Sequence, residues 1–210
     1  MRIIKVQGRG VVSTEPDICI LSFVAEAQTK EYSDCLSKLN QHTEQLRQGL
    51  SASGLNIHDL KTTDFNIRVE HKYVQQRHVF VGYRGSHHLH IELPTNKDLL
   101  NKILGKVAEG YSGVEISISF SVKDKESLRN RTLQEAVRVA KANAKTIADA
   151  AGLKLGEIQQ LDYGWAEVRI HEYGSRMVME DALMAISPPD IDPEDVSAED
   201  SVTLVYEIED

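Results

Sequence analysis

The sequence predicts an α+β fold, a largely antiparallel sheet with helices packed on it, in the order β-β-α-β-β-α-β-α-β-β. Three observations lead to this class. Neighbouring strand-like segments are joined by short turns, helical segments follow pairs of strands, and residues 114–122 alternate strictly between apolar and polar side chains. Strands joined by hairpins pair antiparallel, and a strand with one polar face belongs to a sheet that is covered on one side.

Two strands open the chain, over residues 2–13 and 18–29. In the second strand both faces begin apolar, which predicts a strand inside the sheet rather than at its edge. Gly8 and Gly10 lie within the first strand. A phosphate-binding glycine loop needs a helix directly after it, whereas here the strand continues. We therefore interpret both glycines as a bulge or as positions of tight backbone packing.

Apolar residues recur at helical spacing over residues 31–52, 97–109 and 123–151. Gly54 and Gly152 supply C-terminal stops for the first and last of these helices. The last helix is rich in alanine, which allows close approach to a partner element. We expect it to pack on its own sheet, with a contact between subunits as the alternative. The inward stripe is predicted to contain Leu133, Val137, Ala140, Ala144, Ile147 and Ala151.

A long hairpin is predicted from residues 59–74 and 79–93, with its tip near residues 75–77, because apolar residues recur at period two on both sides. The remaining strands are expected at residues 157–170 and 202–208.

The sequence predicts one domain over residues 1–170 and 200–210, with residues 171–199 as an acidic, proline-containing flexible loop or arm. The net charge is −8, and residues 177–210 contain many acidic residues but no Lys or Arg. No face of clustered basic residues is evident, so we predict no nucleic-acid partner.

An apolar patch interrupts this acidic segment. An apolar stretch inside an acidic, proline-flanked loop has little local core to join, which favours docking to a subunit or partner. A short helix folded on its own domain is the alternative. The predicted interaction residues are Met177, Val178, Met179, Leu183, Met184 and Ile186.

Residues that could carry chemistry are few. His88 and His90 share one strand face, and Asp64 would lie opposite them in the hairpin, which makes these three weak candidates for a metal site. The alternative is two half-exposed histidines on the polar face of a sheet. No catalytic motif is recognisable, so we predict no enzyme, no catalytic residues and no cofactor. Cys19 and Cys35 are interpreted as small buried hydrophobes, a disulfide being the alternative.

The first residues lack the apolar run of a secretory signal, and no stretch is long enough for a spanning helix. As given, the chain is expected to be cytoplasmic, or periplasmic if a signal was removed.

Several stretches in order resemble the SIMPL family, whose biochemical function is unknown. They are Val6-Gln-Gly-Arg-Gly10, Pro16-Asp17 before an apolar strand, Gly54-Leu-Asn-Ile57, and Ala148-Asp-Ala-Ala-Gly-Leu153. The family includes bacterial envelope proteins, some of them ring-like oligomers. The resemblance implies an assembling or partner-binding domain without catalytic residues. We thus predict a non-enzymatic homo-oligomer or partner-binding protein. One alternative is a small-molecule- or metal-binding enzyme that uses the His-rich hairpin; another is an envelope or oxidative-stress protein, if the chain is exported.

Overall fold

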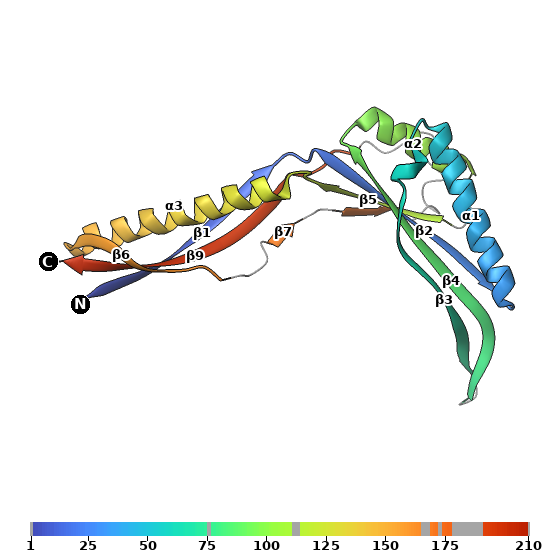
Figure 1. Cartoon of the computed structure of the whole chain (residues 1–210), viewed down its shortest axis with the longest axis horizontal. Coiled ribbons are helices and arrows are strands. Elements are labelled where there is room, and N and C mark those ends of the chain that lie inside the picture. The colour runs from blue at the N-terminus through green and yellow to red at the C-terminus, as the bar shows by residue number, and fades with distance from the viewer. Residues whose placement is uncertain are drawn as a thin grey trace. The chain divides into compact units, whose positions relative to one another are not determined.

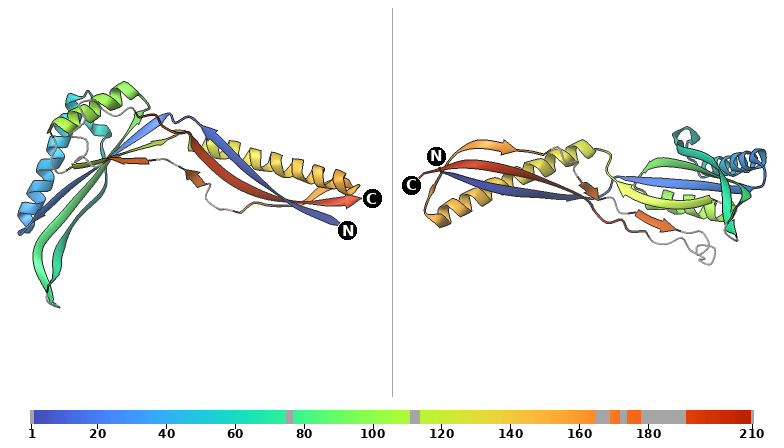
Figure 2. Two further views of the ribbon diagram at one scale, coloured as in Figure 1. Left: turned by 180° about the vertical axis from the view of Figure 1, so that it is seen from behind. Right: turned by 90° about the horizontal axis from the view of Figure 1, so that it is seen from below.

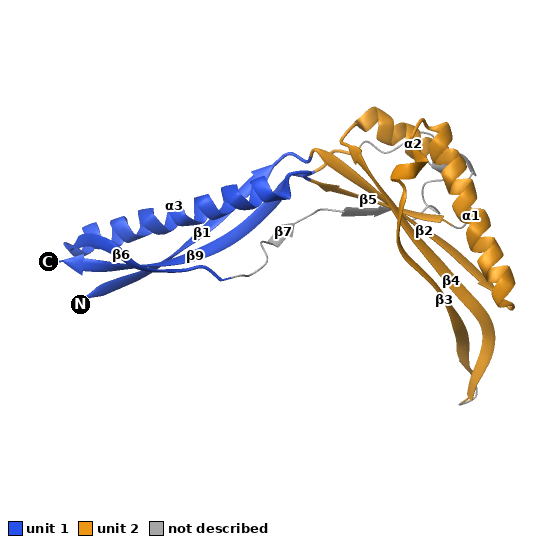
Figure 3. Cartoon of the chain, viewed as in Figure 1, with its two compact units in different colours: residues 1–16, 122–173, 194–210 blue, residues 17–121, 174–193 orange. Residues whose placement is uncertain are grey.

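The computed structural model of the chain describes residues 2–74, 77–110, 114–164, 169–171, 174–177 and 191–209. Its internal contacts divide it into two compact units, which Figure 3 colours separately. Unit 1 comprises residues 1–16, 122–173 and 194–210, and unit 2 comprises residues 17–121 and 174–193. Both units combine antiparallel strands with helices, which confirms the predicted α+β class.

Unit 1 is an antiparallel sheet with one long helix on one face (Figures 1 and 2). Strand β1 (Ile3–Thr14) pairs along its whole length with β9 (Val196–Glu209). The other side of β9 pairs with β6 (Lys154–Asp162) and β7 (Arg169–His171). Helix α3 (Lys125–Ala151) packs on β1 and β9. The single strand expected at residues 157–170 is therefore two separate strands.

Gly8 and Gly10 let the backbone of α3 lie directly on β1. A Cβ at Gly8 would lie 2.1 Å from the carbonyl oxygen of Ala136, and one at Gly10 would lie 2.2 Å from that of Thr132. Real Cβ atoms do not approach backbone atoms so closely, so only glycine fits at either position. The prediction of tight backbone packing at both glycines is confirmed.

The buried stripe of α3 differs from the predicted one. Its members recur at every fourth position and are small or polar in the middle of the helix: Leu128, Thr132, Ala136, Ala140, Ala144 and Ala148. Of the predicted residues, Ala140 and Ala144 are buried, whereas Ile147 is 49% exposed. The prediction followed the larger apolar residues. Only small residues fit between α3 and the sheet, because the glycines of β1 let the backbones of α3 and β1 come too close for a large side chain.

Unit 2 is a five-stranded antiparallel sheet in the order β3-β4-β2-β5-β8. The strands are β2 (Ile18–Thr29), β3 (Lys61–Val74), β4 (Arg77–Pro94), β5 (Val114–Ser121) and β8 (Gly174–Met177). Helices α1 (Tyr32–Ala52) and α2 (Lys97–Gly110) pack on one face, and the short 3-10 helix η1 (Ile57–Asp59) leads into β3. The central place of β2 confirms that it lies inside a sheet.

The main core of unit 2 lies between this sheet and the two helices. Phe23 of β2 is fully buried, with Leu89 of β4 and Ile116 of β5 opposite it on the neighbouring strands. Leu46 of α1 and Ile103 of α2 close the cluster from the helical side. Strand β5 alternates as predicted, with its apolar residues buried and residues 115, 117 and 119 half-buried on the other face.

The β3–β4 hairpin is present with the expected tip, since Val74 and Arg77 are paired. Within residues 171–199, the predicted acidic connection, the structure describes the last residue of β7, all of β8 and the beginning of β9 at Val196. The limits and the flexibility of this connection stay predictions. Whether the two compact units form the single predicted domain stays a prediction, because two such units can still unfold together.

None of the helices in the described part of the chain carries an apolar stretch long enough to cross a bilayer. Cys19 and Cys35 are both buried and free, as interpreted from the sequence. Burial raises the pKa of the Cys19 thiol to about 11, which keeps it protonated and unreactive.

Candidate functional site

His87 lies on the helix-facing side of β4 and joins three elements of unit 2. Its Nδ1 lies 2.9 Å from the hydroxyl of Thr43 on α1, and its Nε2 lies 2.9 Å from the hydroxyl of Thr62 on β3. The ring also meets Phe65 edge to face, with the centroids 5.2 Å apart. Both ring nitrogens are thus occupied by threonine hydroxyls. This arrangement fixes the ring between helix and sheet rather than presenting it to a substrate.

The surroundings of His87 favour its neutral form. Burial lowers its pKa below the usual 6.5, and the positive charge of Arg47 and then His88 lowers it further. The unfolded chain therefore binds a proton at a higher pH than the folded protein does. The contribution of His87 to stability is complete above its unfolded pKa and is lost as the pH falls from there through the folded value.

We expect the free energy of unfolding to decrease between about pH 7.5 and about pH 5.5, and the decrease to be smaller in His87→Gln. Glutamine can still bond the two threonines but does not titrate. Urea unfolding at both pH values measures the difference, and His58→Gln at an exposed position is the control. An identical pH dependence in wild type and His87→Gln would show that His87 is not responsible.

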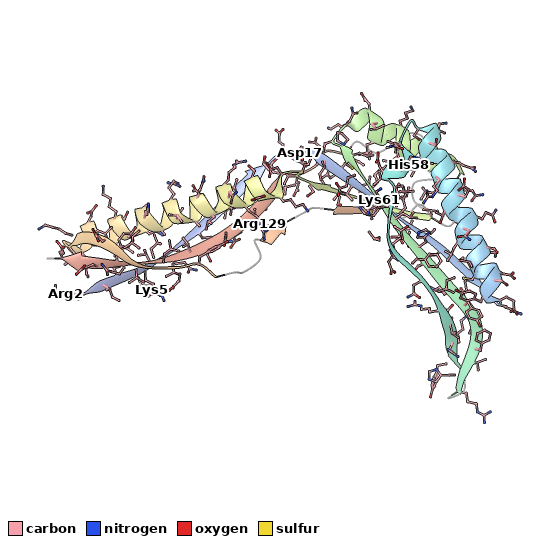
Figure 4. The ribbon with its side chains drawn as sticks, viewed as in Figure 1. Arg2, Lys5, Asp17, His58, Lys61 and Arg129 are labelled. Atoms are coloured by element: carbon pink, nitrogen blue, oxygen red, sulfur yellow. The ribbon has the colours of Figure 1, made fainter. Side chains whose placement is uncertain are left out.

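The predicted metal candidates lie on the opposite, open face of the same sheet. Asp64 is paired with His88, as the predicted hairpin requires, but the residue opposite His90 is Lys61. Lys61 lies at the start of β3, close to His58 (Figure 4). The Nζ of Lys61 donates a hydrogen bond of 2.7 Å to the carbonyl oxygen of His58. In the described ranges, no three or more potential metal ligands cluster. His88, His90 and Asp64 therefore do not form such a cluster.

Cys35 and His42 share α1 but belong to different surroundings. The Cys35 thiol is fully buried and donates a hydrogen bond of 3.5 Å to the carbonyl of Ala27. His42 is half-buried, and its Nδ1 lies 3.1 Å from the carbonyl of Glu26. Cys35 packs with Leu39 against the sheet, which matches its interpretation as part of the core.

Unit 1 contains one buried carboxylate, Asp200, within the part of the chain whose side chains are described. The Tyr163 hydroxyl donates to it over 3.0 Å and the Ser201 amide over 2.7 Å. The hydrogen bond to Asp200 raises the pKa of Tyr163. Arg129, labelled in Figure 4, lies on α3 of the same unit. Both carboxylate oxygens of Asp200 accept hydrogen bonds, so its hydrogen-bonding capacity is used in linking β9 to the segment after β6.

The predicted interaction patch lies almost wholly outside the described residues. Only the backbone of Met177, the last residue of β8, is described, and it pairs with Ile116 of β5. The docking role of Met177, Val178, Met179, Leu183, Met184 and Ile186 stays a prediction.

Among the described residues of unit 2, exposed large apolar side chains gather on the β3–β4 hairpin. Strand β2 accompanies β4 only as far as Tyr83, so residues 69–74 and 77–82 form a two-stranded ribbon, which we call the hairpin arm. Figures 1 and 2 show it extending past the beginning of α1. On the arm, Tyr73 is 65% exposed, Phe80 50% and Val69 49%.

Aromatic rings line one face of the arm. Tyr73 meets His78 edge to face at 5.1 Å, His71 meets Phe80 at 6.1 Å, and Phe80 meets Tyr83 at 5.6 Å. The sequence predicts that these residues lie in a hairpin, but it does not predict a binding surface there. The period-two pattern of β3 could have revealed it, because Phe65, Ile67, Val69, His71 and Tyr73 all fall on one face.

The chain resembles curated bacterial proteins over three quarters of its length. It is 27% identical over 167 residues to the 26 kDa periplasmic immunogenic protein of Brucella melitensis, which covers 75% of this chain and 65% of that protein. It is 24% identical over 157 residues to the uncharacterized protein YggE of Edwardsiella ictaluri, covering 74% of this chain and 65% of the relative. The chain thus spans about two thirds of the length of the relatives it matches.

Residues 4–206 match the family described as SIMPL, protein of unknown function (DUF541). This range includes both units, the glycine pair of β1 and the hairpin arm. The resemblance inferred from the short motifs is therefore confirmed over nearly the whole sequence, and the chain belongs to the SIMPL family.

Proposed function

We propose that this protein is a non-enzymatic assembly protein whose hairpin arm binds a second copy of the same chain. The observation that carries the proposal is the aromatic face of the arm, where Tyr73 and Phe80 are at least half exposed. An isolated two-stranded ribbon is marginally stable in water, and three or more strands are usually needed. Exposed aromatic side chains on such a ribbon are typical of a surface that another molecule covers.

The edge of the sheet supports a second copy as the occupant. In the described sheet β3 is an edge strand, paired only with β4. Its exposed charges complement a second antiparallel β3: a register centred on Asn66 places Asp64 of each copy opposite Arg68 of the other. The same register places Phe65 opposite Ile67. Opposite charges directly across a strand pair stabilise it, and a two-fold axis makes each pair occur twice.

Light scattering after size-exclusion chromatography tests the assembly. We expect the wild type to exceed the 23.5 kDa of one chain as its concentration rises. Tyr73→Ser combined with Phe80→Ser should remain at the mass of one chain. Aromatic anchors contribute about 2 kcal/mol each, so the dissociation constant should rise about a thousandfold or more.

The matched control is Ile147→Ser combined with Leu161→Ser, two exposed apolar residues of unit 1 at 49% and 53% exposure. It should assemble as the wild type does. A wild type that stays at one chain mass at every concentration, or an arm variant that assembles normally, would contradict the proposal.

A charge swap distinguishes a second copy from an unrelated partner. Asp64→Arg places like charges opposite Arg68 in the proposed register and should weaken the assembly. Adding Arg68→Asp to the same chain restores opposite charges and should restore the assembly. An unrelated partner would not be rescued by a change within this chain, so failure of rescue would rule out the β3–β3 register.

We propose that the protein acts in the bacterial periplasm. The name of the Brucella relative supports this placement, although the chain spans only 65% of that protein. Fractionation of the native host's cells tests it: recovery of the protein with cytoplasmic markers alone would refute the placement.

A further inference from the structure

Two histidines lie together on the aromatic face of the hairpin arm. His71 is paired with Phe80, and His78 is paired with Tyr73, so the two histidines are diagonal neighbours across the ribbon. Their ring centroids lie 6.5 Å apart and the ring planes meet at 84°. Both side chains are exposed, so modest side-chain rotations can bring two ring nitrogens to one point outside the sheet.

We infer that His71 and His78 form a binding site for a late first-row divalent metal ion, and that the site binds Cu²⁺ most tightly. Imidazole nitrogen is a good ligand for copper, nickel and zinc, and among these ions affinity peaks at Cu²⁺. A metal–nitrogen bond is about 2.0–2.1 Å long, so the two rings must turn inward to share an ion. Water fills the remaining coordination positions. The site is open and exchangeable, unlike a closed structural metal centre.

The aromatic neighbours favour this pair over separate, freely rotating histidines. Phe80 contacts the ring of His71 and Tyr73 contacts that of His78, both edge to face. These contacts restrict the two imidazoles to one side of the ribbon. Fewer rotamers then have to be given up when the ion binds, which lowers the entropic cost of binding.

The other histidines with described side chains are less suited. Both nitrogens of His87 bond to threonine hydroxyls, and Nδ1 of His42 lies against a backbone carbonyl. His88 and His90 lie on the open face of the sheet, and Nδ1 of His90 is buried without a hydrogen-bond partner among the described residues. A buried nitrogen cannot reach an ion in solvent. The arm pair has two exposed rings on one face.

Titration of the whole chain with Cu²⁺ alone tests the inference, at a dilution where light scattering reports a single chain. Binding is followed by calorimetry, and pulsed electron paramagnetic resonance counts the coordinated imidazoles. We expect one equivalent of Cu²⁺ with two imidazoles. His71→Ala and His78→Ala should each leave at most one imidazole and weaken binding at least roughly tenfold, the loss that even an outer-shell partner causes.

The control replaces the alternative pair, His88→Ala with His90→Ala, and should keep the two-imidazole signal. Circular dichroism of all variants checks that they fold. Saturable binding that the arm variants leave unchanged, or loss of the signal in the control instead, would overturn the site, as would the absence of saturable binding. The result is independent of self-assembly because it is measured on the single chain.

Discussion

Gly8→Ala is expected to destabilise unit 1 by about 3 kcal/mol or more, and Gly10→Ala by a similar amount. In each variant the new Cβ would lie within 2.2 Å of a backbone oxygen of α3. A backbone atom cannot turn away as a side chain can, so the helix must move off the sheet or the strand must bend. Either movement opens the alanine contacts along the whole stripe. Urea unfolding measures the loss, which is a large share of the stability of an ordinary domain.

The control for this experiment is Gly164→Ala, also in unit 1, where an added Cβ would meet no atom within 4 Å. Its unfolding free energy should change by less than about 0.5 kcal/mol, as is usual for a surface substitution. If Gly8→Ala were as stable as the wild type, α3 could not lie against β1 as described.

Phe23→Ala should destabilise unit 2 by about 4 kcal/mol. Phe23 is fully buried at the centre of the sheet, between Leu89 and Ile116 on the neighbouring strands. Alanine removes most of the side chain and leaves a cavity that the strands on both sides cannot fill, since their hydrogen bonds fix the spacing. The conservative Phe23→Leu should recover more than half of the loss because it keeps most of the apolar volume.

Amide hydrogen exchange on Gly8→Ala and Phe23→Ala together tests the predicted single domain. If the two compact units unfold as one, each substitution should lower protection in both units equally. If they unfold separately, Gly8→Ala should affect α3 and β9 but not β2, and Phe23→Ala should do the reverse. The second outcome would replace one predicted domain with two.

Elements with a clear local pattern were predicted closely. The helix predicted at residues 31–52 corresponds to α1, Tyr32–Ala52, and the strand predicted at residues 114–122 corresponds to β5, Val114–Ser121. Both have an unbroken periodicity, and α1 has a glycine just past its end. The strand expected at 157–170 was less accurate, because β6 contains irregular pairing with β9 between Leu155 and Gln160. A bulge shifts the alternation of side chains, so period two alone cannot locate the ends of such a strand.

The candidate site was only partly predictable. The register of Asp64 with His88 follows from the position of the hairpin tip. The bonds from His87 to Thr43 and Thr62 do not, because they join residues of three elements whose contacts depend on how α1 lies on the sheet. The exposure of Tyr73 and Phe80 also depends on where β2 stops accompanying β4, which no local pattern records.

Taken alone, the sequence determined the α+β class, the helices and most strands, the strand setting of Gly8 and Gly10, and the family. These follow from periodicity and from short motifs, which are local properties. Only the tertiary structure decided which face of α3 is buried, since the glycines of β1 admit Ala136 and Ala140 while Ile147 stays exposed. The tertiary structure also decided that the aromatic face of the arm is exposed. Burial depends on the distances between elements far apart in the chain, and those distances are set by packing.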